Sequence, residues 1–122
     1  PFLSIGGRVL RRELNLEAPD LDAPGPFRFG RPGSAARLLA DCGFEEVDEE
    51  ELTIRFAFAS PEEFTAMLGD LSVSMTTTLA EHPAETRERV WQAIRREVEG
   101  SGEGAGVALD NIVRIAAGRR PR

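Results

Sequence analysis

With 122 residues, of which 41% are hydrophobic, the chain is long enough to close one modest core, so we expect a single unit over residues 1–122. Its 15 basic and 21 acidic residues leave a formal net charge of −6, which opposes binding to nucleic acid or to an anionic membrane, since both contacts neutralise phosphates. Every basic residue is an arginine, and there is one cysteine and one histidine, which excludes lysine-based catalysis, an intrachain disulfide and a Cys/His zinc site.

The first segment predicts a helix. One apolar helical face is approximated by Phe2, Ile5, Val9 and Leu14. Gly6 and Gly7 would each cost roughly 1 kcal/mol inside a helix, so we expect the helix to begin at about Gly7.

A loop and a short helix follow. Residues 17–26 hold three prolines and a glycine, which remove hydrogen-bond donors and fix φ, and they predict a connecting loop. After the apolar link Phe27–Gly30, the apolar spacing predicts a helix over Ala35–Asp41. Gly43 suits a left-handed residue after the helix, with Phe44 folding back on the last turn.

The clearest strand comes next. Leu52, Ile54, Phe56 and Phe58 alternate with smaller or polar residues, as in a strand with one apolar face. The acidic residues 45–51 before it are interpreted as a solvated entry to that strand and not as a calcium loop, because they lack the glycine and the spacing of one.

The second half of the chain predicts more helices and a last strand. Ser60–Glu63 has the pattern of a capping box, and the helix after it runs to about Ala80, either whole or broken near Gly69. Another helix is expected after Pro83. After a glycine-rich turn, the β-branched run Leu109–Ala117 predicts a strand that is buried on both faces.

This order of elements is typical of an α/β protein, or of an α+β fold for the chain taken alone. Two strands form only a marginal sheet in water, so we interpret the chain as the end of a larger α/β sheet.

Several motifs have both a functional and a structural interpretation. The glycines 102, 104 and 106 are spaced as in a nucleotide-binding loop, but a helix precedes them and a strand follows, so we interpret them as a linker. Asp20 and Asp22 are spaced as in some metal sites, but a proline-rich loop favours turn residues, and we predict no metal site.

The other single residues receive structural interpretations, with two exceptions. His82 is interpreted as a residue at a helix boundary, Cys42 as a small buried residue, and the arginines after residue 118 as a solubilising tail. Phe27 and Phe29 lie beside the glycine- and proline-rich loop, which leaves them as candidates to face a ligand.

A family resemblance adds to this interpretation. The segments Ala23–Gly30, Ala35–Phe44, the strand to Phe58, and Ser60–Phe64 together resemble the C-terminal half of class I S-adenosylmethionine-dependent methyltransferases of the small-molecule, UbiE-like kind. The last segment, Val107–Gly118, is similar to the final antiparallel strand of that family. The likeness covers most of the chain and rests on the order of these segments.

The resemblance implies a Rossmann-like sheet of which this chain supplies the substrate side, with two antiparallel strands. It also implies that Pro1 follows the fifth strand of such an enzyme, so that the residues that bind S-adenosylmethionine lie upstream. We therefore expect no cofactor and no methyltransferase activity in the chain alone, and we assign it no catalytic residue. By analogy, the side chains that wall the pocket of the methyl acceptor are Phe2, Phe27, Phe29, Phe64 and Met67.

The expected partner is thus a small-molecule methyl acceptor, in a cytoplasmic enzyme without a signal peptide or a membrane span. The alternative is a non-catalytic interaction module whose strand edges pair with a partner or with a second copy of the chain. A homodimer is possible under both hypotheses.

Overall fold

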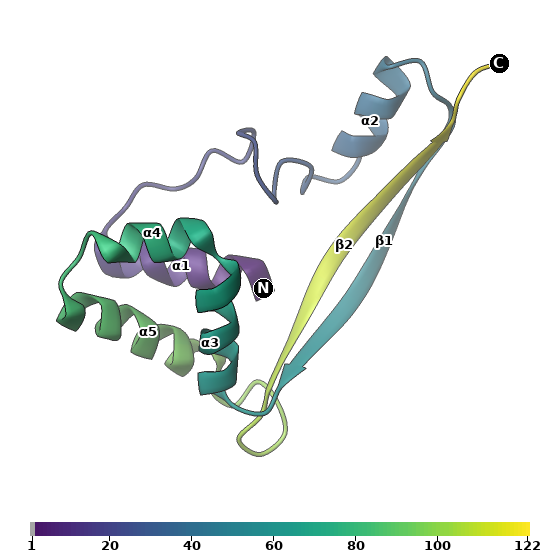
Figure 1. Cartoon of the computed structure of the whole chain (residues 1–122). Helices are drawn as coiled ribbons and strands as arrows, with labels where there is room; N and C mark the ends of the chain where they lie inside the picture. The colour runs from purple at the N-terminus through teal and green to yellow at the C-terminus, as the bar shows by residue number, and fades with distance from the viewer. Residues whose placement is uncertain (1) are drawn as a thin grey trace. The chain divides into compact units, whose positions relative to one another are not determined.

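The computed structural model describes residues 2–122, with side chains from Ser4 onward. Its elements follow one another as α1 (Phe2–Leu14), α2 (Ser34–Asp41), β1 (Glu45–Phe58), α3 (Pro61–Leu71), α4 (Val73–Ala80), α5 (Ala84–Val98) and β2 (Val107–Arg119), as Figure 1 shows. The strands β1 and β2 pair antiparallel in a two-stranded sheet, and the mixture of helix and strand fits the expected α+β class. None of the helices in this part of the chain has the length and the apolar character that a membrane crossing requires.

Contacts between residues group the chain into two compact units. We call them the helical unit, made of Pro1–Ala18 and Arg55–Asn111, and the ribbon unit, made of Pro19–Ile54 and Ile112–Arg122. The boundary crosses both strands, so each unit holds part of the sheet. The sequence predicts one unit over residues 1–122, whereas the contacts between residues divide the chain into these two units.

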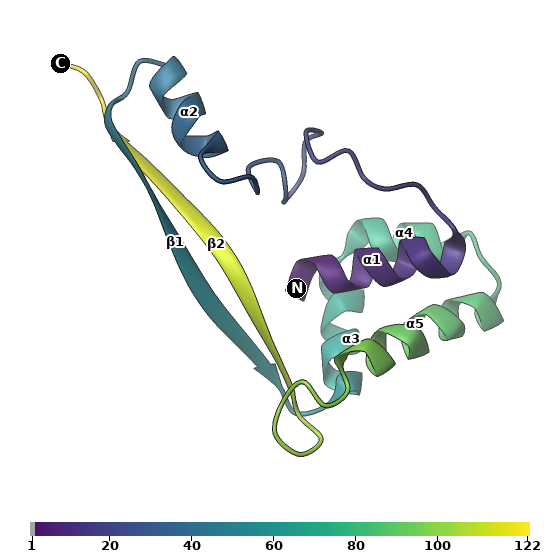
Figure 2. The same ribbon diagram turned by 180° about the vertical axis from the view of Figure 1, so that it is seen from behind.

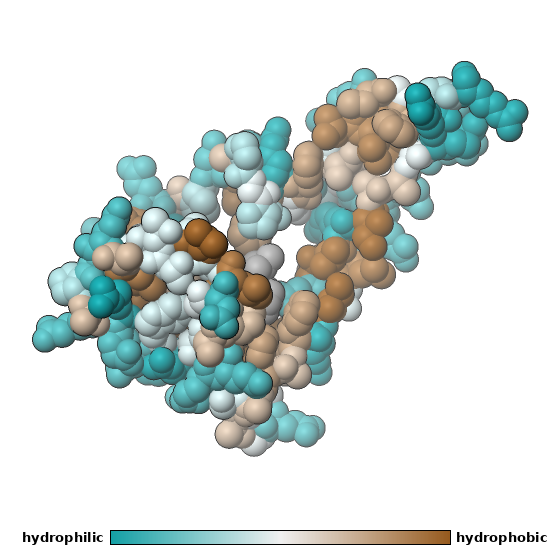
Figure 3. Space-filling view, viewed as in Figure 1, coloured by the Kyte–Doolittle hydropathy of each residue, from teal (hydrophilic) through white to brown (hydrophobic). Residues whose placement is uncertain are grey.

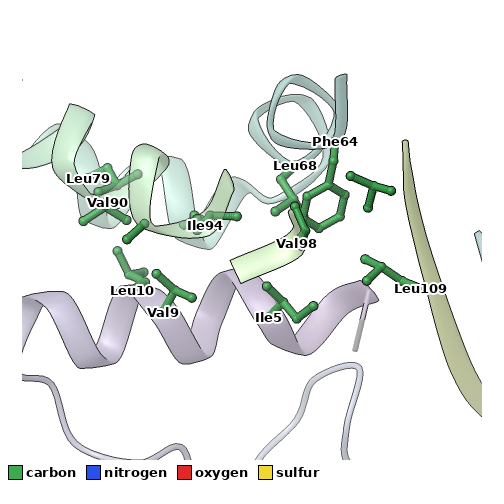
Figure 4. Packing of buried hydrophobic residues seen from close by; sticks show 13 residues of the cluster. Ile5, Val9, Leu10, Phe64, Leu68, Leu79, Val90, Ile94, Val98 and Leu109 are labelled. Atoms are coloured by element: carbon green, nitrogen blue, oxygen red, sulfur yellow. The ribbon is translucent and has the colours of Figure 1, made fainter. Parts of the chain in front are cut away.

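The helical unit is built around one hydrophobic core. On α5 and on α3, buried apolar residues recur four positions apart, as Val90 and Ile94 or Phe64 and Leu68 do, so each helix has one apolar face. The helices α1 and α4 each contact a neighbour in this unit and lie side by side in Figures 1 and 2. Figure 4 shows the buried side chains pointing toward one another between the helices. The core consists of Ile5, Val9, Leu10, Phe64, Leu68, Met75, Leu79, Val90, Ala93, Ile94, Val98, Val107 and Leu109.

The first helix begins at Phe2, so the predicted start at about Gly7 is wrong. The reason lies in the packing at Gly6, where an added Cβ would lie 3.1 Å from Met75 Sδ and 3.2 Å from Leu68 Cδ1. A glycine here allows α1 to approach α3 and α4 closely. This tertiary contact offsets the cost of about 1 kcal/mol that a glycine imposes within a helix.

The capping box at the start of α3 is confirmed. Ser60 Oγ accepts a hydrogen bond from the backbone N–H of Glu63 at 3.2 Å, and the Glu63 carboxylate accepts one from the N–H of Ala59. Of the two alternatives for the helix that runs to about Ala80, the broken one is correct: α3 and α4 are separated at Ser72, where ψ is 86°, three residues after Gly69. Gly69 stays within α3.

In the ribbon unit, β1 already begins at Glu45, so the acidic run 45–51 is part of the strand and not its entry; most of its side chains are exposed, as the interpretation of a solvated segment predicts. Arginines of β2 pair with these carboxylates. Arg114 Nη1 lies 2.6 Å from Glu51 Oε2, and Arg119 Nη2 lies 2.9 Å from Glu45 Oε2. These cross-strand pairs offset the repulsion that six neighbouring acids would otherwise bring to one strand.

One face of the ribbon is apolar and exposed. Because Glu51 and Arg114 pair on one face, the residues that alternate with them point to the other face. We call this other face of the ribbon unit the apolar face: it carries Leu52, Ile54, Val113 and Ile115, whose exposed fractions are 38%, 41%, 37% and 50%. Figure 3 shows hydrophobic surface along the strands. The prediction that the last strand is buried on both faces is therefore wrong.

The end of α2 confirms the prediction for this turn. Gly43 adopts a φ of +89°, its N–H donates to the carbonyl of Ala40 at 2.9 Å, and the N–H of Phe44 donates to the carbonyl of Leu39 at 3.1 Å. The expectation that Cys42 is buried is wrong, because it lies exposed on a helix that has no buried residue.

Candidate functional site

The five side chains expected to wall an acceptor pocket lie in different surroundings. Phe27 and Phe29 belong to the ribbon unit and are 40% and 43% exposed. Phe64 and Met67 belong to the helical unit, where the structure brings them together at the core. The prediction for Phe2 concerns a side chain outside the described part of the chain.

Phe64 is fully buried, and its ring centroid lies 5.3 Å from that of Phe58 in a tilted arrangement. Met67 is partly buried and packs against the same core. Aromatic contacts of this kind stabilise the packing of a core. In this unit Phe64 therefore supports α3 from inside, and Met67 is the more accessible of the two.

The ribbon unit has an open surface cavity of about 380 Å³ beside α2, a volume in the range of small-molecule sites. Phe29 lines this cavity, and Phe27 is not among its lining residues. The lining combines charged and apolar side chains. The charged ones are Arg28, Arg31, Arg37, Asp22 and Asp41, and the others include Phe29, Pro32 and Leu38.

The arginines of this cavity differ in how their charges are offset. Asp22 Oδ1 lies 3.9 Å from Arg28 Nη1 and 3.8 Å from Arg31 Nη1, so it interacts with both at long range. The guanidinium carbon of Arg28 also lies 5.6 Å from the ring centroid of Phe29, a cation–π contact. Among the described side chains, Arg37 has no ion-pair or hydrogen-bond partner. Its positive charge is the least compensated one in the cavity.

Short turns arrange the loop that leads into the cavity. The N–H of Asp22 donates to Asp20 Oδ1 at 2.9 Å, which supports the interpretation of these two acids as turn residues. The N–H of Gly30 donates to the carbonyl of Phe27 at 3.0 Å. These turns hold Arg28 and Arg31 on the loop next to Arg37 in the first turns of α2.

A carboxylate of the ribbon is bonded to the start of α2. Gly33 is the N-cap, with φ at +80°, and its N–H donates to Glu49 Oε2 at 2.7 Å. The other carboxylate oxygen, Glu49 Oε1, is buried and has no hydrogen-bond partner among the described residues. Since Glu49 already binds this amide, a ligand in the cavity would meet arginine side chains and not the N-cap amide.

The helical unit contains a bidentate cross-strand ion pair between Arg55 and Asp110. Arg55 donates from Nε to Asp110 Oδ1 at 2.7 Å and from Nη2 to Oδ2 at 3.1 Å. These hydrogen bonds, together with the charge of Arg55, lower the pKa of Asp110, and the same bonds raise the pKa of Arg55. Both side chains are exposed, so we interpret the pair as a structural link between the strands.

The glycine-rich segment behaves as a connection between α5 and β2. A Cβ on Gly102 would lie 2.8 Å from the backbone carbonyl of Gly106, so the glycines allow the chain to pass close to itself. The structure therefore favours the linker interpretation. Among the described residues, no group of three or more His, Cys, Asp or Glu side chains could hold a metal ion.

Sequence reasoning singled out Phe29 and missed the arginines that share its cavity. Arg28, Arg31 and Arg37 lie within ten residues of one another in an acidic chain, and this local excess of positive charge was a signal for them. Their convergence on one cavity depends on the turns of the loop, which spacing alone did not predict. The arrangement provides positive charge beside an apolar wall. Comparison with protein-family models, with curated proteins and with solved structures found no match for this chain.

Proposed function

We propose that this chain is the substrate-side C-terminal part of an S-adenosylmethionine-dependent methyltransferase that acts on a small molecule. In this proposal the ribbon of β1 and β2 is the end of a larger Rossmann-like sheet, and the chain alone is inactive. Two features support it: the ordered segments that resemble this family, and the apolar face of the ribbon unit.

The apolar face is the observation that carries the proposal. Its residues are at least 37% exposed, and no residue of the ribbon unit is buried. A two-stranded ribbon is marginal in water, and contiguous exposed apolar surface marks a place where another part of a protein packs. The remainder of a layered α/β sheet is a partner that would remove this face from water.

The chemistry explains why a substrate-side part needs no catalytic constellation. S-adenosylmethionine supplies the methyl group, and the residues that hold it belong to the upstream half of the enzyme. Methyl transfer requires the acceptor lone pair to be aligned with the methyl group and water to be excluded. In the proposal Phe27 and Phe29 contact the acceptor, while Phe64 and Met67 stabilise the packing of the helical unit.

Isothermal titration calorimetry of the 122-residue chain with S-adenosylmethionine tests whether this chain binds the cofactor by itself. We expect no binding, because the proposal assigns the cofactor-binding residues to the upstream half of the enzyme. Tight binding with one-to-one stoichiometry would contradict the proposal. In the encoding gene, we expect a strand followed by a G-x-G-x-G loop upstream of the codon for Pro1.

A second candidate function is a non-catalytic interaction module that forms a homodimer. The same apolar face favours it, as does the fact that each of the two strands has only one neighbour in the sheet. Light scattering at low micromolar concentration measures the association. A dimer that Ile115→Asp dissociates and Thr53→Asp preserves would place the interface on the apolar face, because Thr53 alternates with Leu52 and lies on the other side. If the reading frame also begins no further upstream than the codon for Pro1, such a dimer favours the interaction module over the enzyme.

A further inference from the structure

The cavity beside α2 differs in charge from the rest of the chain. Three arginines and two aspartates line it, whereas the whole chain carries a net charge of −6. The cavity is therefore locally positive, and electrostatic attraction between it and a small anion is strongest at short range, where salt screens it least.

The arginines suit the recognition of an anion with two or more oxygens in one plane. A guanidinium group presents a rigid fork of N–H donors that matches carboxylate and phosphate groups. Arg37 has no partner among the described side chains, so an anion need not displace one. Arg28 and Arg31 meet Asp22 only at 3.9 and 3.8 Å, beyond hydrogen-bond distance, and are free to donate elsewhere.

The cavity also has an apolar side. Phe29 and Leu38 line it and are 43% and 47% exposed. The cation–π contact with Arg28 holds the Phe29 ring next to the charged side chains. An apolar group placed against Phe29 and Leu38 would remove part of this surface from water.

We propose that this cavity binds a small organic anion, with a carboxylate or a phosphate monoester bound by Arg28, Arg31 and Arg37 and an apolar body against Phe29 and Leu38. The proposal rests on the residues of the ribbon unit alone. It shares Phe29 with the proposed acceptor site, but its test requires neither methyl transfer nor a methyl acceptor.

The test is an NMR titration of the ¹⁵N-labelled 122-residue chain, following the arginine Nε–H signals. The probes are benzoate, phenyl phosphate and benzamide, the last being a neutral analogue of similar shape. We expect saturable binding of at least one of the two anions and much weaker binding of benzamide. The anion that binds more tightly identifies the head group. Equal binding of benzamide, or no saturation by either anion in the millimolar range, would overturn the proposal.

Three variants make the assignment specific to this cavity. Arg37→Gln removes the unpaired guanidinium and should weaken anion binding by about tenfold, the loss typical of one charge-assisted hydrogen bond. Arg96→Gln removes the same charge from the exposed side of α5 and should leave the affinity unchanged. Asp22→Asn removes the competing carboxylate and should strengthen binding about threefold, by a charge effect of the size seen at exposed sites.

The comparison of Arg37→Gln with Arg96→Gln separates a site from general attraction, because both variants change the net charge equally. Equal losses in Arg37→Gln and Arg96→Gln would mean that only net charge matters, and the proposal would be wrong. Asp22→Asn is expected to increase the affinity for the anion. Damage to the fold would lower this affinity, so an increase cannot be explained by such damage. The amide spectrum of each variant without ligand serves as the control for folding.

Discussion

The helical unit and the ribbon unit contain apolar residues in equally regular patterns, but only one of them buries these residues. In the helical unit Phe64, Val90 and Ile94 have no exposed surface. In the ribbon unit Ile54 and Ile115 alternate as regularly along their strands and remain 41% and 50% exposed. Periodicity therefore states which face of an element is apolar, and burial depends on whether another element covers that face.

Ion pairs occur in both units, so they do not account for the difference between the units. In the ribbon unit, arginines of β2 pair with the glutamates of β1 across the sheet, as Arg114 and Glu51 do. These pairs lie partly in water, where each contributes at most about 1 kcal/mol to stability. A dry core contributes several times more per residue, so we expect the helical unit to determine the global stability of the chain.

The largest expected effect comes from truncating one isoleucine in each unit. Ile94→Ala should lower the free energy of unfolding by about 2 to 5 kcal/mol, because it leaves a cavity in a packed core. Ile115→Ala, which removes the same atoms from an exposed side chain, should lower it by less than about 1 kcal/mol. Urea unfolding followed by circular dichroism, which reports helices and strands, measures both, and the fluorescence of Trp91, which packs against the core, reports the helical unit separately. Equal losses for the two variants would remove the distinction between the units.

An intermediate effect is expected at the far end of the ribbon. A Cβ on Gly118 would lie 2.9 Å from Phe44 Cβ and 3.2 Å from Val47 Cγ2, so Gly118→Ala forces the strand and the turn apart. We expect a loss of about 1 to 3 kcal/mol in the protection of nearby amides, measured by hydrogen exchange. Protection in α5 should stay constant if the units open separately.

The matched control for this prediction is Gly25→Ala, also in the ribbon unit. Apart from the glycine itself and its two chain neighbours, no residue has an atom within 4 Å of the position of its added Cβ. This variant should change amide protection by less than about 0.5 kcal/mol, as most surface substitutions do. A similar loss in both variants would show that the contact with Phe44 is not responsible, because Gly→Ala at an open position lowers the entropy of the unfolded chain and does not by itself destabilise the fold.

The smallest effect concerns the ion pair of Arg55 and Asp110. Because Arg55 lowers the pKa of Asp110 in the folded state, the pair contributes fully to stability above the ordinary pKa of 3.8, and the contribution is lost as the pH falls through the lowered value. In an NMR titration the Asp110 carboxyl should have its midpoint below 3.8. Arg55→Gln should move the midpoint upward, whereas Arg96→Gln should not change it. An unchanged midpoint in Arg55→Gln would mean that the pair does not persist in solution.

The residue types near a helix end predicted that end correctly where short-range hydrogen bonds determine it. The left-handed turn at Gly43 and the capping box at Ser60 each depend on residues within five positions, and both are confirmed. The strand through Ile54 and Phe56 was predicted for the same reason, since alternation is a property of neighbouring residues.

The features that sequence reasoning missed depend on distant residues. The early start of α1 depends on how Gly6 packs against Met75, and the extension of β1 through its acidic half depends on Arg114 and Arg119. For the candidate site, Phe29 was correctly chosen as a residue outside the core, whereas its roles and those of the other predicted pocket residues stay predictions. The arginine-lined cavity depends on turns that fold a loop back on itself, and no single-residue signal describes such a shape.

The exposed thiol described at the end of α2 gives each unit its own spectroscopic label. The chain has one cysteine and one tryptophan, and Cys42 lies in the ribbon unit whereas Trp91 lies in the helical unit. A dye attached to the accessible sulfur of Cys42 can accept excitation energy from the indole of Trp91. The efficiency of this transfer reports how far apart the two units are and how widely that separation varies, in the natural sequence and without engineering a single residue.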